Sequence, residues 1–197
     1  MSDASKKEDD EGKAQIRHAR REDVPIILQL IQELAAYEKE TDAVEATPAL
    51  LLQTIAFAPP PLLPTVASTS SSPPDATISA ARPARCLLLF APDGAPAGMA
   101  LYFYNYSTWK ARPGIYLEDL FVREEHRGRG YGQRLLAELA REVVGMDGGR
   151  LEWCVLKWNA PSIGFYESGH VGARAMSEWQ TMRVDGEALM RLAERAG

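Results

Sequence analysis

A glycine-rich turn at residues 127–132 separates an apolar run typical of a strand, 116–122, from a run typical of a helix. The turn reads Arg-Gly-Arg-Gly-Tyr-Gly, and such closely spaced glycines let backbone N–H groups approach a ligand without side chains in the way. The helix behind the turn adds unsatisfied N–H groups and the positive end of its dipole, and Arg127 and Arg129 add full charges. The turn therefore suits a pyrophosphate.

Two common phosphate-binding loops have other patterns. This turn lacks the Lys-Ser/Thr ending of the nucleoside-triphosphate loop, and its glycines at 128, 130 and 132 do not have the spacing of the dinucleotide fingerprint. Taken alone, it could be a strand-to-helix connection without a ligand. The pattern that it does match is Arg-x-x-Gly-x-Gly, from Arg127 to Gly132.

Composition narrows the class of protein. The 197 residues suit one domain with a substantial core, and 46% hydrophobic with 25% charged residues is typical of a globular protein. A net charge of -5 argues against a nucleic-acid partner and leaves room for a cationic substrate. No apolar run is long enough to span a bilayer, and the first residues are charged where a secretory signal would be apolar. We expect a cytoplasmic protein with no membrane partner.

Cysteine and histidine are scarce. Cys86 and Cys154 fall in expected strands, and two cysteines make no disulfide framework, so we expect both to be buried free thiols. The three histidines, His18, His126 and His170, lie far apart in sequence and have no ligand-like spacing. We therefore expect no metal.

Two segments fall outside the expected fold. Residues 1–13 are polar, charged and without period, which predicts a disordered tail before a single domain at 14–197. Residues 58–84 are rich in Pro, Ser, Thr and Ala, with little apolar surface to offset their ordering entropy. That stretch is predicted to be a flexible insertion, because the chain on either side looks like parts of one fold.

The remaining chain predicts a mixed α/β sheet with helices on its faces. Asp23 can cap the first helix, and Gly145 can end the helix behind the glycine turn. In order, we expect a strand at 16–19, helices at 23–39 and 47–57, strands at 86–90, 98–106 and 115–122, the helix behind the turn, a strand at 148–156, a short helix from Asn159, a strand at 179–184 and a helix at 186–196.

Four places together resemble the Gcn5-related N-acetyltransferase (GNAT) superfamily and, within it, the diamine (spermidine/spermine) N-acetyltransferase group. They are residues 32–38, 116–122, 127–132, and 158–162 with 165–166. The resemblance runs from Ile16 to about Leu192, interrupted by the insertion. It implies a GNAT-type acyl-CoA N-acyltransferase fold, a mixed and mostly antiparallel sheet flanked by helices, with acetyl-CoA as co-substrate and a homodimeric assembly.

The resemblance also implies roles for individual residues. In the family, a strand pairs with the pantetheine arm, the glycine loop holds the pyrophosphate, and further contacts lie near the thioester. The matching cofactor positions here are Leu120, Phe121, Val122, Arg127, Gly128, Arg129, Gly130, Tyr131, Gly132, Gln133, Asn159 and Ser162. Tyr37, Glu38 and Glu118 match amine-binding positions, and Tyr166 matches the acid that protonates the departing thiolate.

The residue types suit this chemistry. A primary ammonium with a pKa of about 10.4 carries its lone pair in only roughly one molecule in a few thousand at pH 7, so a base is needed. Glu118 could remove the proton directly or through a water, or it could only anchor the cation. A tyrosine stays protonated at working pH, so Tyr166 could donate to a thiolate, although an aromatic packed beside Phe165 would look the same in sequence.

The substrate stays open at this stage. The leading prediction is a small primary amine such as a diamine or polyamine, but the acidic residue that the diamine group has after its Asn is Ala160 here. One alternative is the side-chain amine of thialysine, ornithine or lysine, whose carboxylate would need a cation such as Lys110 or Arg112. Another is a CoA-binding module without catalysis, against which Glu118 and Tyr166 argue. Acetylation of protein amines has no particular support.

Overall fold

The computed structural model describes residues 12–58 and 76–196. The chain divides after Leu156 into two compact units, and each is described by itself. Most of the predicted tail, 1–11, and of the predicted insertion, 59–75, lies outside the described residues. Within the described ranges no helix is long and apolar enough to cross a membrane.

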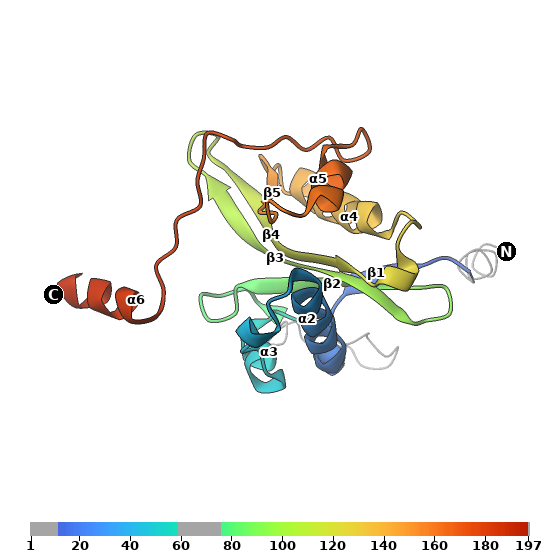
Figure 1. Cartoon of the computed structure of the whole chain (residues 1–197), viewed down its shortest axis with the longest axis horizontal. Helices are drawn as coiled ribbons and strands as arrows, with labels where there is room; N and C mark the ends of the chain where they lie inside the picture. The colour runs from blue at the N-terminus through green and yellow to red at the C-terminus, as the bar shows by residue number, and fades with distance from the viewer. Residues whose placement is uncertain (1–11, 59–75, 197) are drawn as a thin grey trace, which may run out of the picture. The chain divides into compact units, whose positions relative to one another are not determined.

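The first unit is built on a five-stranded sheet in the order β1-β2-β3-β4-β5 (Figure 1). The strands are β1 Gln15–His18, β2 Ala84–Phe90, β3 Pro96–Ser107, β4 Arg112–Val122 and β5 Leu151–Trp153. Neighbours from β1 to β4 are antiparallel, and β5 is parallel to β4. A parallel neighbour needs a crossover connection, which the helix behind the glycine turn provides. The predicted mixed, mostly antiparallel sheet is confirmed.

Helices cover both faces of this sheet, with α2 and α3 on one face and α4 on the other (Figure 1). Their bounds are α2 Val24–Glu38, α3 Pro48–Thr54 and α4 Tyr131–Gly145, with 3-10 turns η1 Arg21–Asp23, η2 Thr41–Ala43 and η4 Glu124–His126. On the α2 face, Ile27 and Leu30 pack with Leu88, Met99 and Phe121 in one buried cluster. The helical spacing of the apolar residues in α2 follows from this one buried stripe.

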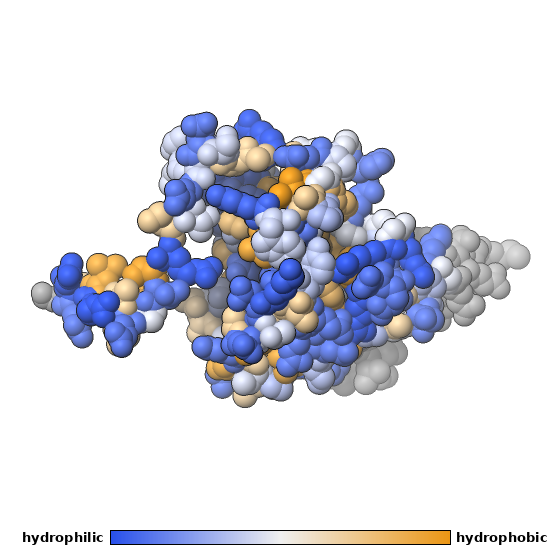
Figure 2. Space-filling model, in the orientation of Figure 1, coloured by the Kyte–Doolittle hydropathy of each residue, from blue (hydrophilic) through white to orange (hydrophobic). Residues whose placement is uncertain are grey.

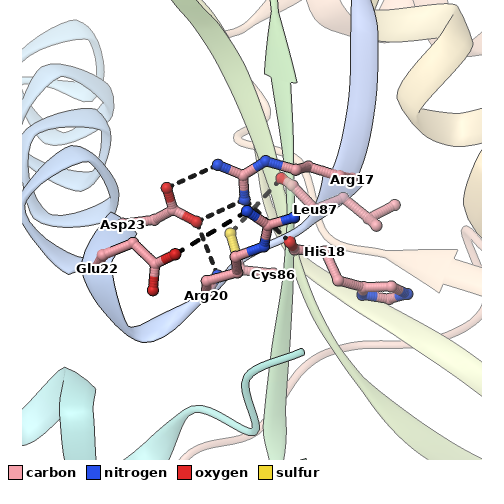
Figure 3. Close-up of polar contacts among 7 residues, drawn as sticks. All are labelled: Arg17, His18, Arg20, Glu22, Asp23, Cys86 and Leu87. Carbon is pink, nitrogen blue, oxygen red and sulfur yellow. Dashed lines mark hydrogen bonds and ion pairs between the residues drawn. The ribbon is translucent and has the colours of Figure 1, made fainter. Parts of the chain in front are cut away.

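Asp23 takes another role than the predicted helix cap. Its carboxylate accepts two hydrogen bonds from the Arg17 guanidinium, at 2.6 and 2.8 Å, and one from the Arg20 N–H at 2.7 Å (Figure 3). It therefore closes the η1 turn ahead of α2. Burial alone would raise the pKa of Asp23, but the Arg17 guanidinium and the Arg20 N–H outweigh burial and hold it below its usual value.

The described end of the predicted insertion, residues 76–84, contains a tight turn and is joined to the chain just after α3. Ser79 and Arg82 exchange backbone hydrogen bonds of 3.2 and 3.0 Å, and the Ala56 N–H donates to Ala84 O at 2.8 Å. β2 therefore begins at Ala84, two residues before the predicted start at Cys86.

The second unit contains α5 Ala160–Glu167, α6 Gly186–Ala193 and the turn η5 Glu194–Ala196. The strand predicted at 179–184 is wrong, because those residues have no strand assignment. A strand needs a hydrogen-bonded neighbour, whereas the Trp179 N–H donates locally to Met176 O. Apolar surface gathers over α6 in Figure 2, and its exposed apolar residues are Leu189, Met190 and Leu192.

Gly98 in β3 gives a prediction about stability. A Cβ at this position would lie 2.5 Å from Phe121 O, so Gly98→Ala must push β3 away from β4. We expect a loss of about 1–3 kcal/mol in the free energy of unfolding, measured by denaturant titration. Gly145→Ala is the control: its Cβ would meet open space, and alanine favours the helix by up to about 1 kcal/mol. Equal stability of the two variants would contradict this packing.

Candidate active site

A β-bulge in β4 decides which way its carboxylates point. Leu117 pairs with Tyr102 and Asp119 pairs with Leu101, so Glu118 is the extra residue between two successive partners in β3. Tyr102 faces α4, where its phenol donates to Glu142 at 2.6 Å, whereas Leu101 packs against the cluster on the α2 face. Paired residues share a face, so the bulge turns Asp119 from the α4 face to the α2 face.

Two carboxylates, Glu118 and Glu38, act on Asp119 at this bulge. Burial, together with the smaller effects of the negative charges of Glu118 and Glu38, raises the pKa of Asp119 to about 6. The pKa of Glu38, at the end of α2, is raised by burial and then by Glu40. Glu118 itself is exposed. Such a cluster of negative charge favours a bound cation.

Asp119 is the residue that the sequence reasoning missed. Glu118 and Glu38 were predicted to contact the amine. Strict alternation along the strand, however, would turn the side chains of Glu118 and Asp119 to opposite faces of the sheet. The available signal was a pair of adjacent carboxylates inside an otherwise apolar strand. The structure adds a half-buried carboxylate with a raised pKa to the candidate site.

The edge of β4 beyond the bulge has no strand partner on the β5 side. β5 pairs only with Ile115, Tyr116 and Leu117, although a strand over 148–156 was predicted. In the described chain, the predicted cofactor positions Leu120 and Phe121 therefore lie on a strand edge without a ladder on that side. Free backbone groups on such an edge can pair with an extended ligand.

The glycine turn contains two residues in a backbone conformation that favours glycine. Gly128 and Gly130 have φ of 74° and 75°, which side-chain-bearing residues rarely adopt, and a Cβ at either would meet nothing within 4 Å. α4 begins at Tyr131, and Gly130 at its N-cap provides no side-chain hydrogen bond. The first N–H groups of α4 thus remain available for an anion. Tyr131 is buried, so it can offer a cofactor its backbone N–H.

The structure brings this turn together with the end of α2. The Arg127 guanidinium lies over the Tyr37 ring, 5.0 Å from its centroid. Its Nε donates to Val122 O at 2.9 Å. A predicted cofactor residue and a predicted amine residue are therefore in direct contact.

The other predicted site residues lie in the second unit. Asn159 caps α5 as predicted, with its Oδ1 accepting from the Ser162 N–H at 3.3 Å. The Tyr166 ring lies beside that of Phe165, with centroids 5.3 Å apart. The backbone O of Tyr166 accepts from the Ala173 N–H at 2.9 Å, which holds the end of α5 to the following chain.

Two expectations about other residues were wrong. Lys110 and Arg112 lie at the opposite end of β4 from the glycine turn; Lys110 donates to Gly149 O at 3.1 Å and Arg112 pairs with Asp147 at 3.5 Å. Arg112 precedes Glu118 by six residues, roughly 20 Å along a strand, which is too far for one small amino acid to span. Cys86 is buried as predicted, but Cys154 is exposed, and its Sγ accepts from the Tyr116 phenol at 3.1 Å.

Comparison with known proteins gives consistent matches over most of the chain. One relative is L-ornithine N5-acetyltransferase NATA1 of Arabidopsis thaliana, 34% identical over 91% of this chain and 87% of that protein. Another is thialysine N-epsilon-acetyltransferase of Bos taurus, 33% identical over 90% of this chain and 96% of that protein. A third, spermidine/spermine N(1)-acetyltransferase-like protein 1 of Homo sapiens, is 31% identical over 91% of this chain but only 24% of that protein.

The fold has solved counterparts as well. An integron cassette protein from the mobile metagenome of V. cholerae superposes with a TM-score of 0.68 at 21% identity, covering 92% of this chain and 98% of that chain.

The model of the acetyltransferase (GNAT) family matches residues 54–170, more than half of the 197 residues. With this match and the relatives above, the resemblance is confirmed, and the chain belongs to the acetyltransferase (GNAT) family.

Proposed function

We propose that this N-acetyltransferase transfers the acetyl group of acetyl-CoA to a primary amine of a small diamine or polyamine. The observation that carries the choice of amine is the cluster of Glu38, Glu118 and Asp119 at the β4 bulge. A diamine carries two cations and no anion at neutral pH, so this cluster can hold one ammonium while the other reacts.

A second candidate is an amino acid with a side-chain amine, such as ornithine or thialysine. Two observations favour it: the names of the two relatives that match over most of their length, and the Arg127 guanidinium beside Tyr37. That guanidinium could pair with a substrate carboxylate, which Lys110 and Arg112 lie too far away to do.

The cofactor site fits acetyl-CoA on the residues present. The edge of β4 at Leu120 and Phe121, which has no ladder on the β5 side among the described residues, can pair with the pantetheine amides, and Val122 lies directly beside it. The backbone of Gly128, Gly130, Tyr131, Gly132 and Gln133, with Arg127 and Arg129, can hold the pyrophosphate. When bound, acetyl-CoA supplies a thioester whose carbonyl carbon accepts the amine.

Side chains of the protein take up and donate the protons in this reaction. In our proposal Asp119 and Glu38 hold an ammonium, and Glu118 at the bulge takes the proton from the attacking nitrogen, directly or through a water. Tyr166 donates its phenolic proton to the departing thiolate. Asn159 and Ser162 contact the cofactor near the thioester, a role supported by the family resemblance.

Three broader proposals accompany this function. The family match at 54–170 runs across the boundary after Leu156, which supports a single acetyltransferase domain at 14–197. The family resemblance supports a homodimer. The third proposal is a cytoplasmic location for this enzyme.

The raised pKa of Asp119 predicts how amine binding depends on pH. Below a pKa of about 6 this carboxyl is protonated and no longer attracts an ammonium. At saturating acetyl-CoA, the KM of the amine should rise as pH falls below 6, approaching about tenfold per pH unit. Asp119→Asn should raise the KM at pH 8 and flatten its dependence on pH. An unchanged slope in that variant would remove Asp119 from the amine site.

The same shift has a consequence for stability with a definite sign. The folded-state pKa of Asp119 lies above its ordinary value of 3.8, so the fold favours the protonated form. The resulting stability is present below pH 3.8 and is lost as pH rises through 6. Asp119→Asn should therefore raise the midpoint of thermal unfolding relative to the wild type at pH 8 more than at pH 4.

A matched set of amines tests the proposed function. Ornithine differs from 1,4-diaminobutane only by a carboxylate, and 1-aminobutane lacks the second ammonium. With acetyl-CoA, CoA release is followed with a thiol reagent and the product is identified by mass. The proposal expects the highest kcat/KM for the diamine, and a higher value for ornithine would replace it with the second candidate. No CoA release with any amine would favour a non-catalytic CoA-binding module.

A further inference from the structure

Four side chains join the amine-binding end of α2 to the cofactor turn, and we call them the α2 clamp. Glu33 and Tyr37 are four residues apart, so they lie on one face of α2. Arg123 and Arg127 stand on either side of the η4 turn, between the end of β4 and the first glycine. Each arginine contacts one of the two α2 residues.

The first contact is a partly buried ion pair. Arg123 donates from Nε and Nη2 to the two carboxylate oxygens of Glu33, both at 2.8 Å. Its Nη1 donates to Pro96 O at 2.8 Å, and the side chain is only 14% exposed. A bidentate pair in this geometry is among the stronger hydrogen-bonded contacts. It fixes α2 to the start of β3 and the end of β4.

The second contact holds the residue that opens the glycine turn. The Arg127 guanidinium lies 5.0 Å from the Tyr37 ring centroid and 5.8 Å from that of Phe121. Its Nε donates to Val122 O, while Nη1 and Nη2 have no hydrogen-bond partner among the described residues. The two rings and the carbonyl therefore orient the guanidinium and leave two of its nitrogens for a ligand.

We propose that the α2 clamp positions the cofactor turn, so that Glu33 and the Tyr37 ring support acetyl-CoA binding although neither belongs to the turn. This inference rests on the proposed function, which places the pyrophosphate at Arg127. Tyr37 then has two separable roles: its ring holds Arg127, and its hydroxyl is the part that the proposed function assigns to amine binding. Without the ring, the guanidinium becomes ordered only when the cofactor binds. The entropy lost in ordering it lowers the affinity for the cofactor.

Calorimetry with CoA in the absence of amine tests the clamp. Tyr37→Leu removes the ring and should weaken CoA binding about 3- to 10-fold, whereas Tyr37→Phe keeps the ring and should bind CoA within about twofold of the wild type. Tyr37→Phe should still raise the KM of the amine. Glu33→Gln, which keeps the size of the side chain, should weaken CoA binding by a similar factor of about 3 to 10.

The pair of Arg17 and Asp23 provides a matched control. It is also bidentate and lies at the other end of α2, so Asp23→Asn should lower stability and leave the CoA affinity unchanged (Figure 3). Wild-type affinity in both Tyr37→Leu and Glu33→Gln, with folding confirmed by circular dichroism, would overturn the clamp while the proposed function stands. If Tyr37→Leu fails to fold, Glu33→Gln decides alone. Absence of CoA binding in the wild type would overturn the proposed function itself.

Discussion

Replacing Tyr166 by phenylalanine is expected to lower kcat by about 100-fold or more while the affinity for CoA changes by less than about twofold. The substitution removes only the phenolic oxygen, so the ring remains beside Phe165, 5.3 Å away between centroids, and α5 keeps its packing. What is lost is the proton donor for the departing thiolate. Steady-state kinetics with a thiol reagent give kcat, and calorimetry gives the affinity for CoA.

The control for Tyr166→Phe is Tyr106→Phe, which removes an exposed phenol on β3 and should leave kcat unchanged. A slow step other than thiolate release would hide the effect, so single-turnover rates should be measured beside steady-state rates. Wild-type rates in Tyr166→Phe under both conditions would assign the residue to helix packing alone.

Replacing Glu118 by glutamine is expected to lower kcat by about 100-fold, with a smaller change in the KM of the amine. Glu118 is the extra residue of the β4 bulge and is exposed, so it can exchange a proton with solvent or with a bound amine. The amide has similar size but cannot accept the proton. The loss should shrink as pH rises toward the pKa of the amine, because more of the amine then arrives unprotonated.

Comparison with Asp119→Asn shows whether Glu118 acts as a general base or only binds the cation. Asp119 is half-buried on the α2 face and should affect mainly KM, whereas Glu118 should affect mainly kcat. If Glu118→Gln raises KM more than it lowers kcat, Glu118 anchors the cation. Another group must then take the proton.

The local features of the fold could be predicted from the sequence because short-range rules determine them. Gly128 and Gly130 adopt positive φ as the turn pattern requires, and Asn159 caps α5 through its own side chain. The prediction of a strand at 179–184 was wrong because strand formation does not depend on local sequence alone. An alternating pattern says which residues could form a strand, but only another part of the fold can provide its hydrogen-bonded partner.

The local positions of the candidate residues could be anticipated from the sequence, except where they depend on register between strands. The family pattern made Glu118 a candidate, yet the turn of Asp119 toward the α2 face follows from a bulge that exists only in the pairing of β3 with β4. The contact of Arg127 with Tyr37 likewise joins residues 90 positions apart, and no local rule connects them. By contrast, the distance from Arg112 to Glu118 follows from strand rise alone, so sequence reasoning could already have excluded that cation.

The central claim is that the strand edge at 120–122 and the glycine turn at 127–132 together bind acetyl-CoA. Titration of the wild-type protein with CoA in a calorimeter, after circular dichroism has confirmed folding, tests it directly. We predict saturable heat with about one CoA bound per chain, weakened when Gly130→Val forces a side chain onto a backbone with φ of 75°. A folded protein that gives no heat of binding with CoA would contradict the account.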